Sequence, residues 1–408
     1  MKLNCRHCSK LLSHEVINLG YHPPSNNYLT AEQLLLPELT LPLRAYVCTN
    51  CWLVQLPVEA SAEDLFTDTY AYFSSISTTW CEHAERFVAE AAKKLQLNEH
   101  SLVVELASND GYLLQYVLKR GIPCLGIEPT RSTSEVARAR GIKTIETFFS
   151  KSLAIELTLQ DGAVSGGADL VIANNVLAHV PDVNDFVSGI SILLKPGGLA
   201  SIEFPHLLRL ISDNQFDTIY HEHYSYLSLS VVRRIAHAFG LMVADVEELS
   251  THGGSLRVWL AHQGTRKQSE AVNMIISNEI SYGLESLLVY SDFQQRAKLV
   301  KHSLLDFLLK SSSSGQLVLG YGAAAKGNTL LNYAGVRPDL LPAVADLSSS
   351  KQGLFLPGSH IPIITPLQLK EFSPDQIIVF PWNLISEVRA QLKEFKLVTF
   401  IPYLQHWN

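Results

Sequence analysis

The sequence predicts an α/β protein whose central part is a doubly wound parallel sheet, with a cysteine-rich domain before it and a smaller α/β domain after it. From about residue 101 onward, apolar strand-like runs alternate with helical segments, which is typical of parallel sheets with helical crossovers. The first 65 residues differ, because they hold two Cys-x-x-Cys pairs and no long helical periodicity. Near residue 315 a second strand–loop–helix unit begins. We therefore expect three domains, at residues 1–65, 66–265 and 266–408.

Length and composition exclude several classes of protein. The 408 residues suffice for two to four domains, at roughly 100–200 residues each. Apolar residues make up 47% and charged residues 17%, which argues against a disordered chain. The net charge of −7 argues against binding to a nucleic-acid backbone. The chain shows no membrane-spanning apolar run, and its start, MKLNCRHC, has no signal-peptide core, so we expect a cytoplasmic protein with neither nucleic-acid nor membrane partners.

The cysteines predict a structural zinc site in the first domain. Each Cys-x-x-Cys turn lets two thiolates converge on one ion, and two such turns complete a tetrahedral site. With four protein ligands, this site has no open position for catalysis; vacant thiols or a redox pair are the alternatives. Cys81 and Cys124 lack this spacing and are expected to be small core residues. The expected ligands are Cys5, Cys8, Cys48 and Cys51.

The central domain can be followed element by element. Its strand-like runs are continuously apolar, which suits strands covered on both faces. The expected strands are Ser101–Leu106, Ile122–Glu128, Ile142–Glu146, Ala168–Asn174 and Gly198–Phe204. The expected helices are Thr79–Leu97, Gly111–Lys119, Ser132–Arg140 and Val183–Leu194. Two strand-like runs with little between them, 241–249 and 253–262, then predict an antiparallel edge.

The last part of the chain repeats the α/β pattern after a long helical stretch. Residues 267–310 are mixed in charge and helical in pattern, and Ser311–Gly315 is expected to be a linker or a helix stop. The run 317–331 then reads as strand, glycine-containing turn and helix. Four further short strands are expected at 341–346, 360–364, 376–380 and 397–401.

A nucleotide site is predicted where the first central strand ends. In VVELASNDGYLL, Glu105 ends a strand and Gly111 lets the backbone approach a ligand at the start of the next helix. Glu128 ends the following strand, where a carboxylate can accept both ribose hydroxyls. Asn174 and Asn175 end a further strand at the same crevice. The dinucleotide fingerprint GxGxxG is absent, and the combination resembles class I S-adenosylmethionine methyltransferases; a Rossmann-like domain for another nucleotide is the alternative.

The segment FDTIYHEHYSYLS holds the densest group of titratable side chains. Histidine can act as a base near neutral pH, an adjacent carboxylate could fix its tautomer, and a tyrosine can donate a hydrogen bond to a developing oxyanion. Metal chelation and an aromatic core loop are the alternatives. His179, just past a central strand, lies near the same crevice or is structural. The segment contains Tyr220, His221, Glu222, His223, Tyr224 and Tyr226.

Two further segments are candidates for binding a substrate. GYGAAAKGN, residues 320–328, offers backbone N–H groups and Lys326 to a phosphate, although such a loop is often only structural. Lys351 is a second anion-contact candidate, or a solvated loop residue. HGGSLR offers His252 and Arg257, or simply forms a hairpin.

Taken together, these motifs resemble the nucleotide-sugar C-methyltransferases of deoxysugar biosynthesis. The resemblance runs nearly end to end, through the two Cys pairs, YFSS, ELASNDGYLL, NNVLAHVPD, YHEHYSY, HGGSLR, GYGAAAKGNTLLN and KQGLFLPGSHIPI. It implies methyl transfer from S-adenosylmethionine to a carbon beside the 4-keto group of a dTDP-linked sugar, with C-3 favoured. A nucleotide-sugar oxidoreductase or epimerase, and a non-enzymatic zinc adaptor, are the competing hypotheses. The oligomeric state is not defined by the sequence, and a monomer is compatible with it.

The resemblance also implies roles for individual residues. His223 is the expected base that forms an enolate, supported by Tyr220, Glu222, His179 and Tyr72, with Tyr70 as a neighbouring candidate. The expected cofactor contacts are Glu105, Ala107, Asn109, Asp110, Gly111, Glu128, Pro129, Asn174 and Asn175. The expected substrate contacts are His252, Arg257, Gly322, Lys326, Asn328 and Lys351.

Overall fold

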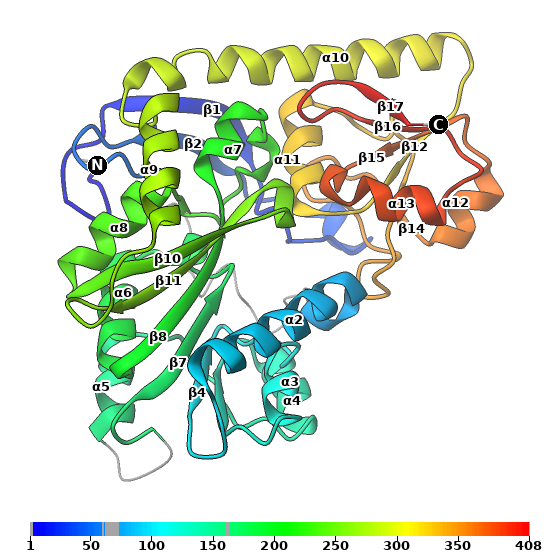
Figure 1. Ribbon diagram of the computed structural model, residues 1–408. Coiled ribbons are helices and arrows are strands. Elements are labelled where there is room, and N and C mark those ends of the chain that lie inside the picture. The colour runs from blue at the N-terminus through cyan, green and yellow to red at the C-terminus, as the bar shows by residue number, and fades with distance from the viewer. Residues whose placement is uncertain (1–2, 59–60, 62–72, 160–163, 408) are drawn as a thin grey trace.

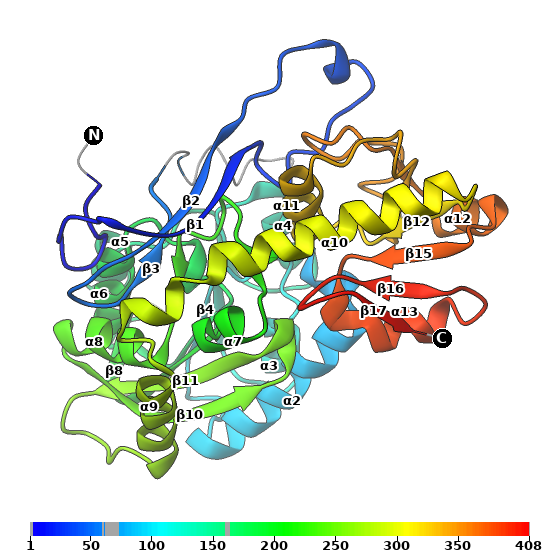
Figure 2. The same cartoon turned by 90° about the horizontal axis from the view of Figure 1, so that it is seen from above.

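The computed structural model describes residues 3–58, 61, 73–159 and 164–407, and these form three sheets (Figures 1 and 2). Tyr70 and Tyr72, two of the candidate site residues, lie outside the described ranges. In the described part of the chain, we find no helix that is both long and apolar enough to cross a membrane.

The first sheet joins the cysteine-rich segment to a distant part of the chain. Three of its strands come from the first 55 residues, and the fourth comes from the histidine-rich segment. All of its pairings are antiparallel, and the short fourth strand pairs Val54 with Tyr226. Its order is β1 (His14–His22), β2 (Leu41–Val47), β3 (Val54–Gln55) and β9 (Ser225–Tyr226).

The central sheet has seven strands in the order β10-β11-β8-β7-β4-β5-β6. The last five of these run parallel, and β11 and β10 close the sheet as an antiparallel edge, which confirms the expected fold class. The strands are β4 (Val103–Leu106), β5 (Cys124–Ile127), β6 (Thr144–Ile145), β7 (Ala168–Asn174), β8 (Leu194–Pro205), β10 (Leu241–Leu249) and β11 (Ser255–His262).

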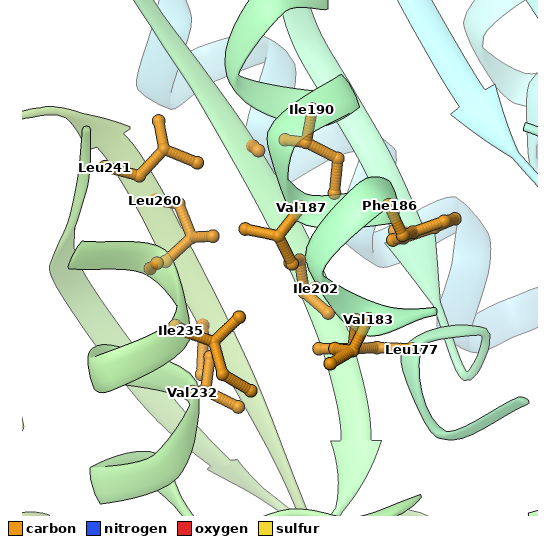
Figure 3. Close-up of a cluster of buried hydrophobic side chains, with 14 of the residues drawn as sticks. Leu177, Val183, Phe186, Val187, Ile190, Ile202, Val232, Ile235, Leu241 and Leu260 are labelled. Carbon is orange, nitrogen blue, oxygen red and sulfur yellow. The ribbon is translucent and has the colours of Figure 1, made fainter. Parts of the chain in front are cut away.

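Helices cover both faces of this sheet. On one face, Phe87 and Leu114 pack with Trp259 of the sheet in one buried cluster. On the other face, Val187 and Ile190 point toward side chains of a neighbouring helix and of the sheet (Figure 3). The first face carries α2 (Thr78–Leu95), α3 (Leu114–Leu118) and α4 (Arg131–Ala139). The second carries α5 (Lys151–Leu159), α6 (Val183–Leu193), α8 (Leu229–Ala238) and α9 (Glu270–Tyr282).

The helical stretch expected at 267–310 is divided in two. Helix α9 ends because Gly283 adopts a φ of +95°, a left-handed conformation that closes the helix. A second helix, α10 (Phe293–Ser313), then crosses from the central domain to the last one (Figure 2). Of the two alternatives expected for Ser311–Gly315, a linker or a helix stop, the structure shows the helix stop: α10 ends at Ser313, within this run.

The third sheet is parallel except for its last strand, and it shares a core with the first sheet. Strand β1 contacts both α10 and α11 (Ala325–Ala334), and Leu43, Phe293 and Leu331 lie in one buried cluster. The strands, in sheet order, are β14 (Ile363–Ile364), β13 (Val344–Ala345), β12 (Val318–Tyr321), β15 (Gln376–Val379), β16 (Leu397–Thr399) and β17 (Gln405–Trp407). The helices beside them are α11 (Ala325–Ala334), α12 (Pro366–Phe372) and α13 (Ile385–Gln391), while α7 (Leu207–Ser212) follows β8.

Candidate active site

A cavity of about 1070 Å³ lies where the three parts of the chain meet. Its wall includes Asn26 from the first part, His223 from the middle and Lys326 from the last. It also includes Ala107 and Asn174, which lie at or just beyond the carboxyl ends of β4 and β7. This is the edge at which doubly wound sheets bind their ligands.

One end of the cavity combines a fixed carboxylate with aromatic side chains. Glu128 is buried, and its two oxygens accept hydrogen bonds from the backbone N–H groups of Asn109 and Thr130, both at 2.9 Å. Burial nevertheless raises its pKa. The adjoining wall is apolar and aromatic, which suits a purine ring beside a ribose. It is formed by Pro129, Phe148, Phe149 and Phe186.

The turn after β4 contains left-handed backbone at two residues that are not glycine. Ala107 and Asn109 have φ angles of 52° and 50°, in the left-handed region, and both line the cavity. Glycine adopts this conformation freely, whereas alanine is strained in it by roughly 1–2 kcal/mol. Left-handed backbone thus occurs in this turn even though the GxGxxG pattern is absent.

Three of the expected cofactor contacts lie behind this loop and are not part of the cavity wall. Asp110 is buried and accepts a hydrogen bond from the Ser75 hydroxyl. Gly111 faces Ile142, whose Cδ1 would lie 2.3 Å from a Cβ at that position, so close packing requires this glycine. Glu105 is fully buried at the end of β4. Their direct contact with a cofactor stays a prediction.

The end of β7 carries buried polar atoms on two asparagines. Within the described part of the chain, Asn174 Oδ1 and both amide atoms of Asn175 are buried without a hydrogen bond. Buried polar groups are rarely left in this state, so these atoms are consistent with a polar ligand in the cavity. Together with Glu128 and the aromatic wall, they fit the ribose, adenine and amino-acid groups of S-adenosylmethionine.

The histidine-rich segment orients one imidazole toward the cavity. His223 Nδ1 lies 2.8 Å from the carbonyl oxygen of Thr218, to which it donates a hydrogen bond. His223 Nε2 is then the unprotonated nitrogen, and it accepts a hydrogen bond of 2.7 Å from the Tyr220 hydroxyl. The ring of His179 meets that of His223 edge to face, with centroids 4.6 Å apart. The structure thus brings the described members of the expected catalytic group together.

The surroundings of His223 favour its neutral form. Burial, followed by the neighbouring charges of His179 and Lys326, holds the pKa of His223 well below the ordinary 6.5. Burial likewise lowers the pKa of His179 and of His252 to about 4. A neutral imidazole can accept a proton, so His223 is available as a base throughout the neutral pH range.

Glu222 does not fix the His223 tautomer, because the Thr218 carbonyl does. Instead, both Glu222 carboxylate oxygens accept hydrogen bonds from Asn26 Nδ2, at 2.7 and 2.9 Å. Glu222 is buried and belongs to the cavity wall. Its partner comes from the connection between β1 and β2, in the cysteine-rich part of the chain.

The carboxy-terminal part contributes two lysines to the cavity. Lys326, near the start of α11, donates a hydrogen bond of 2.9 Å to Asn383 Oδ1 and lies 4.4 Å above the ring of Trp382. Burial lowers its pKa to about 8. Lys351 donates to the carbonyl of Ala323 at 2.9 Å. Trp382 in turn donates to Asp217, whose pKa burial raises to about 6.

Gly322 and Asn328, the other expected contacts in this loop, are not part of the cavity wall. A Cβ at Gly322 would lie 2.4 Å from Pro381 Cδ, so this position requires glycine for packing. Asn328 is buried, and its side chain donates to the carbonyl of Ser25 at 2.6 Å. Their contact with a substrate stays a prediction.

Arg257 lines the cavity but is already engaged in a buried ion network. It pairs with Glu203 at 2.6 Å and with Glu247 at 3.0 Å, and His83 lies 3.0 Å from the same Glu203 carboxylate. Although burial raises the pKa of Glu203, the hydrogen bond from His83 and the charge of Arg257 bring it below its ordinary value. His252 lies nearby, against the ring of Trp80 at 5.2 Å.

The four expected zinc ligands converge. Their sulfur atoms all lie within 4.8 Å of one another, and the Cys5–Cys51 and Cys8–Cys48 sulfur pairs are 3.5 Å apart. Sulfurs about 2.3 Å from a tetrahedral zinc would lie about 3.8 Å apart, so the arrangement fits the ion. Gln55 donates to the Cys5 sulfur at 3.1 Å and steadies it.

Comparisons with known proteins agree with this arrangement. The model described as "Putative zinc binding domain" matches residues 5–66, a methyltransferase domain matches 77–246, and a C-methyltransferase C-terminal domain matches 250–402. The chain is 33% identical to C-methyltransferase NovU of Streptomyces niveus over 392 residues, which cover 96% of this chain and 92% of that protein.

Two more distant similarities each cover less than half of this chain. A ubiquinone biosynthesis O-methyltransferase of Acinetobacter baylyi is 23% identical over 217 residues, covering 47% of this chain and 88% of that protein. The solved magnesium protoporphyrin IX methyltransferase of Synechocystis with bound S-adenosylmethionine is 16% identical, with a TM-score of 0.35, over 46% of this chain and 82% of that chain.

The full-length similarity and the three matched domains lead to one assignment. The cofactors are S-adenosylmethionine, for the central domain, and zinc, for the four-cysteine site. The chain belongs to the family of S-adenosylmethionine-dependent C-methyltransferases that combine a zinc-binding amino-terminal domain with a C-methyltransferase carboxy-terminal domain.

Proposed function

We propose that this enzyme methylates a sugar carbon beside the 4-keto group of a dTDP-linked deoxysugar, with C-3 as the favoured position. S-adenosylmethionine, when bound, supplies the electrophilic methyl group. A saturated carbon beside a ketone becomes a nucleophile when it loses a proton to form an enolate, so the enzyme needs a base and a stabiliser of the enolate oxygen. His223, as the base, and Tyr220, as the stabiliser, both lie on the wall of the cavity.

The observation that carries the proposal is the hydrogen-bonded series Thr218–His223–Tyr220. Because Thr218 holds the proton on Nδ1, the lone pair of His223 Nε2 is directed to the Tyr220 hydroxyl, beside the cavity. In the proposed reaction, Nε2 takes the proton from the carbon next to the ketone. Tyr220, released from Nε2, donates its hydrogen bond to the keto oxygen as negative charge develops there.

Size and charge support a nucleotide sugar as the acceptor. Single ligands occupy pockets of about 300–1,000 Å³, and the cavity of about 1070 Å³ has room for two. Lys326 and Lys351 place positive charge on the carboxy-terminal side of the cavity, where a diphosphate can bind.

The test separates the proton step from methyl transfer. A panel of dTDP-4-keto sugars is incubated with labelled methyl donor, and label in the sugar is measured. With an accepted sugar and no donor, solvent deuterium should enter the acidic carbon. His223→Asn should slow this exchange by about 10²–10⁴-fold, the usual effect of losing a general base.

His100→Asn is the matched control, since the His100 side chain is 87% exposed. It should exchange like the wild type. Exchange at the wild-type rate in His223→Asn would assign the base to another group, with His179 next. Absence of methyl transfer to every sugar in the panel would contradict the proposed acceptor class.

A further inference from the structure

A short segment of the zinc-binding part connects the active site to the carboxy-terminal part. Residues 23–28, in the connection between β1 and β2, are hydrogen-bonded to two distant segments of the chain. Asn26 donates to both oxygens of Glu222, at 2.7 and 2.9 Å. Tyr28 donates to the carbonyl of Ala323 at 2.7 Å, and the carbonyl of Ser25 accepts from the Asn328 side chain at 2.6 Å. The segment therefore contacts the histidine-rich segment and the GYGAAAKGN loop together.

The contact between Asn26 and Glu222 lies on the wall of the cavity. Both residues line it, and Glu222 is buried, with 2% of its surface exposed. A hydrogen bond to an ionised carboxylate is shorter and stronger than one between neutral groups, especially away from bulk water. The amide of Asn26 consequently fixes the orientation of the Glu222 carboxylate.

A fixed carboxylate matters for the reaction at His223. When His223 accepts a proton it becomes an imidazolium, and burial disfavours that charge. Glu222, the preceding residue, places negative charge in the same cavity. This negative charge can stabilise the imidazolium only if the carboxylate is already oriented when the proton moves. A mobile carboxylate would have to reorganise first, and that would cost free energy during the reaction.

We propose that Asn26 is a positioning residue of the active site: it holds the Glu222 carboxylate at the cavity wall and so makes the zinc-binding part of the chain contribute to the reaction at His223. This inference rests on the proposed function of the same site. Asn26 acts through Glu222 and need not touch the sugar or the methyl donor.

Three variants test the inference. Asn26→Ala removes the donor and should lower kcat by about 10–100-fold, the effect of misplacing a catalytic group, with the KM for S-adenosylmethionine changed less than about twofold. Asn27→Ala is the matched control, because Asn27 is the exposed neighbour, and it should behave like the wild type. Zinc content and melting temperature are measured for all variants.

Asn26→Asp provides a signature that a structural role would not produce. Its carboxylate would face that of Glu222, and two close carboxylates share one proton, which raises one pKa of the pair. As pH falls through that raised value, the shared proton restores a hydrogen bond, so the activity of Asn26→Asp relative to wild type should increase. The activity of Asn26→Ala relative to wild type should not depend on pH.

The other titratable and charged groups around the pair stay constant in this comparison. They are Tyr28 on the same segment as Asn26, Lys351 and Asp346 on the carboxy-terminal side, and Tyr220, His179, His223, His252 and Lys326 on the cavity side. Equal kcat values for Asn26→Ala and wild type, or a ratio for Asn26→Asp that does not rise in acid, would overturn the inference.

A measurement without substrate separates the inference from the proposed function. In the double-mutant cycle of Asn26→Ala and Glu222→Gln, coupled residues give shifts of melting temperature that are not additive. Additive shifts would show that Asn26 does not hold Glu222, and would overturn the inference. Failure of the wild type to methylate any dTDP-4-keto sugar would instead contradict the proposed function. The double-mutant cycle needs no substrate, so it would still show whether Asn26 and Glu222 are coupled.

Discussion

Replacing Tyr220 with phenylalanine removes one oxygen atom from the active site and should change the pH dependence of the proton step in a calculable way. The Tyr220 hydroxyl donates to His223 Nε2 at 2.7 Å, and this bond forms only while the imidazole is neutral. It therefore stabilises the neutral form and lowers the pKa of His223, in addition to the effect of burial.

The magnitude follows from the value of one hydrogen bond. A net contribution of about 0.5–1.5 kcal/mol, at 1.36 kcal/mol per pKa unit, corresponds to about 0.4–1.1 units. In the wild type, exchange should be lost as pH falls through the lowered pKa of His223, well below 6.5. In Tyr220→Phe this acid limb should move to higher pH by about 0.4–1.1 units.

At neutral pH, above the pKa of His223, the exchange rate no longer changes with pH. This plateau rate depends on the second role proposed for Tyr220, which is to stabilise the enolate oxygen. Loss of a donor to a developing oxyanion typically costs about 10²–10³-fold, so exchange at neutral pH should fall by about that factor. Solvent deuterium incorporation into an accepted keto sugar, followed by NMR across pH, measures limb and plateau together. An unshifted limb would refute the hydrogen bond to Nε2, and an unchanged plateau would refute stabilisation of the enolate by Tyr220.

Three further predictions concern other parts of the chain. Cys48→Ser should lose zinc and stability together, because metal binding contributes folding energy here; a variant that keeps a full equivalent of zinc by metal analysis would contradict this ligand set. Glu128→Gln should weaken binding of S-adenosylmethionine by about 1.5–3 kcal/mol, measured by calorimetry, and unchanged affinity would remove Glu128 from the donor site. Ala107→Gly should raise the free energy of unfolding by about 1 kcal/mol. Removing the left-handed strain gains roughly 1–2 kcal/mol, and the more flexible unfolded chain costs about 0.4–1 kcal/mol. A lower melting temperature than that of the wild type would show that Ala107 is not strained.

The fold was predictable where the local pattern decides the structure. The strand Ala168–Asn174 has the expected ends, because a buried apolar run lies between Gly-Gly and Asn-Asn. The stretch 267–310 was harder, because its helical pattern continues across Gly283, whose backbone conformation divides it into two helices.

The site was predictable in the same local sense. His223 and Tyr220 are three residues apart, so their proximity could be expected from the sequence. Asn26 and Glu222 are 196 residues apart, and His83 and Glu203 are 120 apart, so no spacing indicates these contacts. Ala107 gives no signal of its left-handed backbone, since the residue type argues against it. Phe148 could have been noticed, because FFS follows a predicted strand near the nucleotide site.

The pairing of β3 with β9 has a consequence for the construction of chimeric enzymes. An exchange that took only residues 1–65 from a relative would carry β1, β2 and β3 but leave behind Ser225 and Tyr226, which complete their sheet. The foreign strands would then have to pair with a segment selected for another partner. A successful exchange should include residues 220–228 with the amino-terminal segment, so that the strand pairing and the histidine-rich segment are inherited as one unit.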